Sequence, residues 1–279
     1  MSADAARRRL LLAAGGALLP PAGTVHAQAQ TALRGVLVPY LSTRTLLAVH
    51  EPIRRHLQAH LGRPVEFFTA RNMLLLARSV RAHEQPLALV PAHMARLAAS
   101  DWGYSVLALP TEDSAIELIA RRPSRLDTPA TLRGRRIATA DPLALATLVL
   151  QRWLRTEQLT EAVELVEIPL LNAALIALER GEVDVMLMAS GQLRTIEDLE
   201  PRGIVTIANL GRTARPCWTA APELPPAEAA AVRQALLTYT PADRPGAAGG
   251  ASFIEATAQR LEAYEPYAAQ LRRLLATAR

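Results

Sequence analysis

Short apolar runs alternate with amphipathic helical stretches along almost the whole chain, and this alternation constrains the fold more than any other feature. Runs such as Val36–Val38 and Leu87–Val90 are short and apolar, as expected of strands buried on both faces. Between such runs, apolar residues recur at helical spacing, as at 46–61. Strands that alternate with helices pack as parallel sheets covered by helices. The sequence therefore predicts an α/β protein built from mainly parallel sheets.

The predicted elements follow from this pattern. Strands are expected at 36–38, 65–68, 87–90, 106–109, 116–120, 136–139, 163–168, 183–188, 204–208 and 217–220. Helices are expected at 46–61, 73–82, 92–99, 142–157, 171–180, 226–239 and 252–277. Pro52 predicts either a kink in the first helix or a helix that begins near His50. Asp141 is the predicted N-cap of helix 142–157, with Pro142 at the first helical position.

The two βα series are separated by the connection 110–115, which predicts two lobes. Residues 28–112 together with 209–279 form the predicted lobe I, and residues 113–208 form lobe II. A chain of 279 residues has the length for one or two such domains. The stretch 241–251, rich in Pro, Ala and Gly, is predicted to be a surface loop.

The N-terminus has the order of parts found in an export signal. Arg7–Arg9 form a basic region, Leu10–Leu19 form an apolar region, and Val25–Ala27 end in a small-residue cleavage pattern. We expect a signal peptide over 1–27, cleaved near Ala27, and a periplasmic mature chain. The arginine run also fits a twin-arginine signal, so the export route stays open. A basic N-terminal helix of a cytoplasmic protein is the alternative.

Charge and composition argue against several classes of function. All 31 basic residues are arginines, but the net charge is only +5 and the arginines are dispersed, so nucleic-acid binding is not expected. Cys217 is the only cysteine, and His56 and His60 lack a third ligand, so no metal site is expected. Motifs for nucleotide cofactors and hydrolases are absent. We expect a monomer that is not an enzyme and holds no cofactor.

Several segments together resemble a known family. They are GVLVPYLS (35–42), HLGRPVEFF (60–68), LVPAHMARLA (89–98), LRGRRIATADP (132–142) and NAALIALERGEVDVMLM (172–188). In this order they resemble the periplasmic solute-binding proteins of phosphate, phosphite and phosphonate ABC transporters. The resemblance covers essentially the whole mature chain. It implies the two-lobed type II periplasmic-binding-protein fold, a small ligand bound between the lobes, and an inner-membrane ABC permease as partner.

The expected site lies where strands end and helices begin, because ligands bind at the carboxyl ends of strands in α/β sheets. Helix N-termini there offer free N–H groups to an anion. The candidate ligand-binding residues in these loops are Tyr40, Ser42, Thr43, Arg71, Asn72, Pro91, His93, Thr139, Asp141, Leu143 and Asn172. Asn172 faces the cleft only if the resemblance holds.

The chain departs from the family pattern at the start of helix 142–157. Phosphonate-binding relatives have hydroxyl residues where residues 142–147 read PLALAT. A doubly charged phosphonate needs several donors when it is desolvated. We therefore expect a more apolar pocket that takes a small organic anion or a weakly polar metabolite, with Arg71 as a candidate partner of a carboxylate. Two other functions stay open: a ligand-sensing module without a transport role, and an exported enzyme on the same scaffold.

Overall fold

The computed structural model describes residues 31–123, 125–126, 128–190, 202–241 and 252–278. The predicted signal peptide and nearly all of the predicted loop 241–251 lie outside these residues. Within them, strands and helices alternate as the sequence predicts. The elements up to the first sheet crossing are β1 (Leu33–Leu37), α1 (Thr43–Leu61), β2 (Val65–Thr69), α2 (Met73–Arg81), β3 (Leu87–Val90), α3 (Ala92–Asp101) and β4 (Ser105–Pro110).

The remaining elements fall into two groups. The middle of the chain forms β5 (Asp113–Arg121), the 3-10 helix Pro129–Leu132, β6 (Arg136–Thr139), α4 (Leu145–Thr156), β7 (Glu164–Glu167), α5 (Leu171–Arg180), β8 (Val185–Ala189) and β9 (Ile204–Ala214). The C-terminal part forms β10 (Cys217–Ala220), α6 (Pro226–Leu237), β11 (Phe253–Ile254), α7 (Ala258–Glu262) and α8 (Glu265–Thr277).

The strands form two mixed sheets, so the two-lobed α/β class is confirmed, but the pairing is less parallel than expected. The first sheet has the order β11-β4-β10-β3-β1-β2, and the second has the order β7-β6-β8-β5-β9. Parallel pairing is confined to β1 with its two neighbours and to β6 with its two neighbours. The other pairs, which are β10 with β3 and β4, β11 with β4, and β5 with β8 and β9, are antiparallel.

The chain passes between the sheets twice, through two short connections. Thr111 and Glu112 join β4 to β5, and Arg215 and Pro216 join β9 to β10. The predicted lobe boundary at 208/209 lies inside β9, which belongs to the second sheet over its whole length. The exact lobe boundaries stay a prediction.

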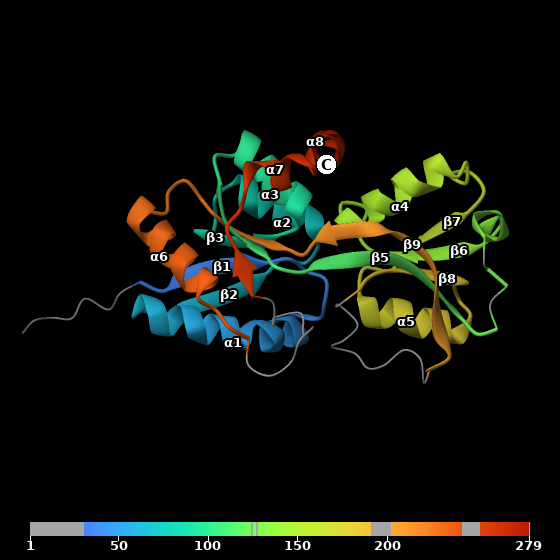
Figure 1. Cartoon of the computed structure of the whole chain (residues 1–279), viewed down its shortest axis with the longest axis horizontal. Helices are drawn as coiled ribbons and strands as arrows, with labels where there is room; N and C mark the ends of the chain where they lie inside the picture. Colours follow the sequence, from blue (N-terminus) through green and yellow to red (C-terminus); the bar gives the residue numbers. More distant parts are fainter. Residues whose placement is uncertain (1–30, 124, 127, 191–201, 242–251, 279) are drawn as a thin grey trace, which may run out of the picture. The chain divides into compact units, whose positions relative to one another are not determined.

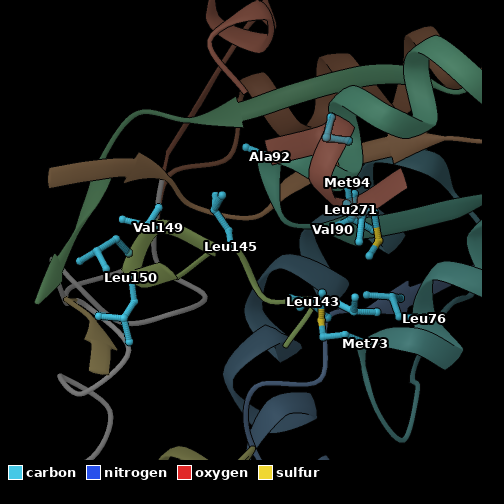
Figure 2. Close-up of a cluster of buried hydrophobic side chains, with 14 of the residues drawn as sticks. Met73, Leu76, Val90, Ala92, Met94, Leu143, Leu145, Val149, Leu150 and Leu271 are labelled. Atoms are coloured by element: carbon cyan, nitrogen blue, oxygen red, sulfur yellow. The ribbon is translucent and has the colours of Figure 1, made fainter. Parts of the chain in front are cut away.

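Helices cover both faces of each sheet because successive strand residues point to opposite sides. In β1, Val36 belongs to a buried cluster that includes α2, α3 and α4, whereas Leu37 belongs to a second cluster that includes α1, α5 and α6. Figure 1 shows α4 and α5 on opposite faces of the second sheet. Figure 2 shows side chains of the first cluster. No helix in the described part of the chain has the length and apolar character needed to cross a membrane.

The structure differs from three expectations about the helices. Of the two alternatives for Pro52, a start near His50 is wrong, because α1 begins at Thr43 and contains Pro52 within it. Helix α4 begins at Leu145 with Ala144 as its N-cap, not at Pro142 with Asp141 as N-cap. The predicted helix 252–277 is instead a short strand, β11, followed by two helices, with a proline in the first turn of α8.

Candidate functional site

A cavity of about 160 Å³ is lined by both sheets where their parallel strands end. Its walls include the segments that follow β1, β3, β6 and β7, together with the end of β8. Tyr40 follows β1, Pro91 follows β3, and Asp141 lies two residues after β6. This is the edge of an α/β sheet at which ligands bind.

Three helices begin at the cavity wall. Pro91 is the N-cap of α3, Ala144 is the N-cap of α4, and Leu171 is the first residue of α5. All three residues line the cavity, and none of these helices has a side-chain cap. The first N–H groups of a helix have no partner within the helix and carry a partial positive charge. The cavity wall is therefore suited to an anion.

Most of the wall is apolar. Ile53, Ile116, Met186 and Trp218 all line the cavity and are buried. His50 lies beside them, and its Nδ1 donates a hydrogen bond to the Leu46 carbonyl at 2.8 Å. Burial lowers the pKa of His50, so the imidazole is neutral at pH 7. A ligand here contacts hydrocarbon over most of its surface.

Asp141 also lines the cavity, but backbone donors already satisfy its carboxylate. Oδ1 accepts a hydrogen bond from the Leu143 N–H at 2.9 Å, and Oδ2 accepts one from the Met73 N–H at 3.0 Å. Met73 is the first residue of α2, so the carboxylate lies at the positive end of that helix. These bonds explain why Asp141 does not cap α4. They join the segment after β6 to the first-sheet helix α2.

Arg215 is the cationic side chain of the cavity wall. The side chain is only 11% exposed, and its Nη2 lies 3.7 Å from the Glu112 Oε2. The Glu112 side chain is 56% exposed, so this ion pair is weak. The Arg215 Nη1 is buried and has no hydrogen-bond partner among the described residues. Burial raises the pKa of Tyr40, and the Arg215 charge partly opposes this rise, so Tyr40 is a neutral phenol.

Four of the residues predicted as ligand-binding line the cavity: Tyr40, Pro91, Thr139 and Asp141. Five others are exposed and outside the lining: Ser42, Thr43, Arg71, Asn72 and Asn172. Ser42 and Asn72 have structural roles instead. Ser42 is the N-cap of α1, and the Asn72 Oδ1 accepts a hydrogen bond from the Leu75 N–H at 2.9 Å as the N-cap of α2.

The last two predicted residues, His93 and Leu143, bind each other. The His93 Nε2 donates to the Leu143 carbonyl at 3.0 Å, and both residues are buried outside the cavity lining. Burial lowers the pKa of His93 to about 4, so the ring is neutral at pH 7. Leu143 shares a buried cluster with Met73 and Leu76, and Figure 2 draws the three side chains together. The pair therefore joins α3 to the segment that precedes α4.

The sequence did not identify several polar residues of the wall: His50, Ser114, Thr213 and Arg215. Ser114 and Thr213 face each other across the antiparallel pair β5–β9, next to the crossing that carries Arg215. Single-sequence patterns do not show which strands bring such residues together. Extending the strand at 204–208 to its true end at Ala214 would have placed Arg215 at a strand end. Among the described residues, no group of His, Cys, Asp and Glu comes together as a metal site.

Comparison with solved structures identifies the class of fold. PhnD1 from Prochlorococcus marinus in complex with methylphosphonate matches with a TM-score of 0.72 and 12% identity, over 87% of this chain and 98% of that chain. A binding protein component of an ABC phosphonate transporter from Pseudomonas aeruginosa matches with a TM-score of 0.66 and 14% identity, over 88% and 98%. An ATP-bound protein from Xanthomonas citri matches with a TM-score of 0.68 and 13% identity, over 87% and 98%. The fold is that of the periplasmic binding proteins.

The sequence itself identifies the family. Residues 36–267 match the family model for the ABC transporter, phosphonate, periplasmic substrate-binding protein. The chain belongs to this family of substrate-binding proteins, whose members bind small molecules for ABC permeases and are not enzymes. No curated protein matches the sequence at a significant level.

Proposed function

We propose that this chain is exported, cleaved near Ala27, and works in the periplasm as a monomeric receptor for a small anionic solute. The solute binds in the cavity between the two sheets, and the loaded protein delivers it to an inner-membrane ABC permease. Tyr40, Pro91, Thr139 and Asp141 form part of the ligand-binding wall in this proposal. Family membership supports the receptor role, and a receptor of this kind needs no nucleic acid and no cofactor.

The observation that supports the anion most strongly is the convergence of three uncapped helix beginnings and the Arg215 guanidinium on one cavity. Helix N-termini and arginine each favour negative charge. The methylphosphonate in the Prochlorococcus structure and the ATP in the Xanthomonas structure are also anions. The apolar remainder of the wall fits the uncharged part of an organic solute.

Thermal unfolding of the mature chain tests this proposal. Anionic solutes of several classes are compared with uncharged analogues of the same size, and mass spectrometry identifies any solute that copurifies. A ligand that binds only the folded chain raises the melting temperature by mass action. We expect at least one class of anion to raise it and the uncharged analogues to have little effect. The proposal fails if no anion changes the melting temperature and the purified chain carries no solute.

A further inference from the structure

Arg215 is a buried cation whose bonding is incomplete. One guanidinium nitrogen, Nη1, is buried without a hydrogen-bond partner among the described residues, and the other terminal nitrogen has only a distant, exposed carboxylate. Burying a charge without hydrogen bonds is energetically unfavourable. Arg215 is stabilised when an anion enters the cavity and accepts hydrogen bonds from its N–H groups.

The other ionisable groups of the cavity wall do not satisfy Arg215. The Asp141 carboxylate accepts hydrogen bonds from two backbone N–H groups, one of them at the beginning of α2. His50 is neutral, and its Nδ1 proton is donated to a carbonyl of its own helix. Arg215 is therefore the wall's charged group that still lacks a close partner in the described chain.

Two hydroxyl groups flank Arg215. Thr213 lies two residues before it, and Ser114 faces Thr213 across the β5–β9 pair. All three residues line the cavity and Ser114 and Thr213 are buried. The planar fork of a guanidinium matches the two oxygens of a carboxylate, and hydroxyls can donate to the same oxygens. Apolar side chains such as Ile53, Met186 and Trp218 complete the wall.

The charges of the wall limit the charge of the ligand. Arg215 is the cationic side chain that lines the cavity, and the Asp141 carboxylate in the same wall repels an anion. A single negative charge is matched by the one guanidinium, and a second charge lacks a counter-ion. The apolar wall adds to the cost of desolvating a dianion.

We propose that Arg215 is the counter-ion of the ligand, and that the ligand is a monocarboxylate with a hydrocarbon body rather than a phosphonate dianion. This inference rests on the proposed function and names the class of its solute. Ser114 and Thr213 hold the same carboxylate, and the apolar wall contacts the hydrocarbon. The sequence-based choice of Arg71 for this role is replaced by Arg215, because Arg71 is exposed and outside the cavity lining.

The test uses calorimetry to measure how tightly straight-chain carboxylates, from acetate to octanoate, bind to the mature wild-type chain. The matched primary amides and alkylphosphonates are measured alongside, at a pH at which the phosphonates are dianions. We expect one or more carboxylates to bind more tightly than the matched amide and phosphonate. In Arg215→Gln, affinity for that carboxylate falls by about 10- to 100-fold, as expected for loss of a charge-assisted bond, whereas the amide is unaffected.

Two further variants keep the test decisive. Arg215→Lys keeps the charge but loses the fork, so its affinity lies between those of the wild type and Arg215→Gln. It also replaces the glutamine variant if circular dichroism shows that this variant does not fold. Arg212→Gln is the matched control: Arg212 lies on β9 three residues away, but it is exposed and outside the lining. The affinity of Arg212→Gln for the same carboxylate stays within about twofold of the wild-type value, as for surface changes in general.

The results separate this inference from the function on which it rests. If phosphonates bind and carboxylates do not, the receptor function stands and the inference is overturned. It is also overturned if carboxylates bind equally well to the wild type, Arg215→Lys and Arg215→Gln. If neither series binds and no solute copurifies with the chain, the receptor function fails as well.

Discussion

The cavity has one charged residue on each of two segments, and the two segments use their charges differently. On the segment after β6, the Asp141 carboxylate accepts two backbone hydrogen bonds, and the neighbouring Leu143 is buried and bound to His93. On the segment between β9 and β10, Arg215 has a buried nitrogen without a partner in the described chain. The chain therefore satisfies the Asp141 carboxylate with its own backbone and leaves the Arg215 guanidinium available to a ligand.

This difference bears on what a substitution in each segment should change. Asp141 and Leu143 connect the second sheet to helices of the first sheet through hydrogen bonds to Met73 and His93. Arg215 instead lies in one of the two crossings between the sheets, near Glu112 in the other crossing. Substitutions after β6 should mainly change stability, whereas substitutions at the crossing should mainly change affinity. The following predictions test this division, beginning with the largest expected effect.

Leu143→Ala should be the most destabilising of these substitutions. Leu143 is buried in a cluster with Met73 and Leu76, and removing a buried leucine side chain costs about 2–5 kcal/mol. Urea denaturation should show a fall of this size in the free energy of unfolding. Leu165→Ala is the matched control, because Leu165 on β7 is 39% exposed, and its cost should be below about 1 kcal/mol. Equal effects at the two positions would contradict the packing role of Leu143.

His93 should make stability depend on pH. Burial lowers the pKa of His93 to about 4 from the usual 6.5, so the unfolded chain binds more protons between these values. Stability therefore rises as pH increases from about 4 to 6.5 and is lost as pH falls through this window. As the pH falls through this window, the protonation of His93 lowers the unfolding free energy by about 3 kcal/mol, since one pKa unit corresponds to about 1.4 kcal/mol. His50 adds to the same trend, because burial lowers its pKa too.

The variant His93→Gln isolates this contribution. Glutamine keeps an N–H donor for the Leu143 carbonyl but does not titrate, so the rise in stability with pH should become shallower. Urea unfolding at several pH values measures the slope. His60→Gln, at an exposed position of α1, should leave the slope unchanged. A slope in His93→Gln as steep as in the wild type would mean that His93 is not the titrating group.

Asp141→Asn should destabilise the chain less than Leu143→Ala does. Its effect on affinity should be opposite to that of Arg215→Gln. The amide oxygen still accepts one hydrogen bond, so we expect a loss of about 1–2 kcal/mol in unfolding free energy. Removing a negative charge from the wall should strengthen carboxylate binding by about threefold to tenfold.

Asp184→Asn is the control for this substitution. The Asp184 Oδ2 accepts a hydrogen bond from the Arg136 N–H at 2.9 Å, but Asp184 does not line the cavity. Calorimetry should show an affinity like that of the wild type for Asp184→Asn and a higher affinity for Asp141→Asn. Weaker carboxylate binding in Asp141→Asn would indicate that the hydrogen bonds of Asp141 to Met73 and Leu143 are needed to shape the binding wall.

The sequence predicts most of the fold because its signals are local. Helical spacing placed α5 at its exact bounds, and Gly62 and Gly181, both with left-handed backbone, are the C-caps of α1 and α5. The start of α4 was missed because Asp is a residue type that commonly caps helices. Asp141 instead accepts a hydrogen bond from the Met73 N–H, and Met73 is distant in sequence. The antiparallel strands were missed because β10 inserts between β3 and β4, which no local pattern shows.

The candidate site was less predictable for the same reason. Tyr40, Pro91 and Thr139 lie at strand ends, so their positions at the cavity follow from local structure. Arg215 lines the cavity only because β9 continues to Ala214 and returns to the first sheet at Cys217. Arg71 also follows a strand, but the adjacent Asn72 caps α2 and Arg71 stays exposed. The choice between the two arginines depends on tertiary pairing rather than on local sequence.

Tyr40→Phe should have the smallest effect, and it tests whether the crossing segment acts alone. The Tyr40 hydroxyl is close enough to Arg215 for the charge to affect its pKa, and it has no hydrogen-bond partner among the described residues. If it donates to the same carboxylate as Arg215, its removal should weaken carboxylate binding by about twofold to tenfold. The unfolding free energy of the ligand-free chain should change by less than about 0.5 kcal/mol, because the ring still packs in place.

Tyr267→Phe on α8, outside the cavity, is the control, and both variants should be measured with the carboxylate and its amide. A loss of affinity for both ligands would show that Tyr40 packs against the body of the ligand, whereas a loss for the carboxylate alone would place its hydroxyl beside Arg215 at the anion.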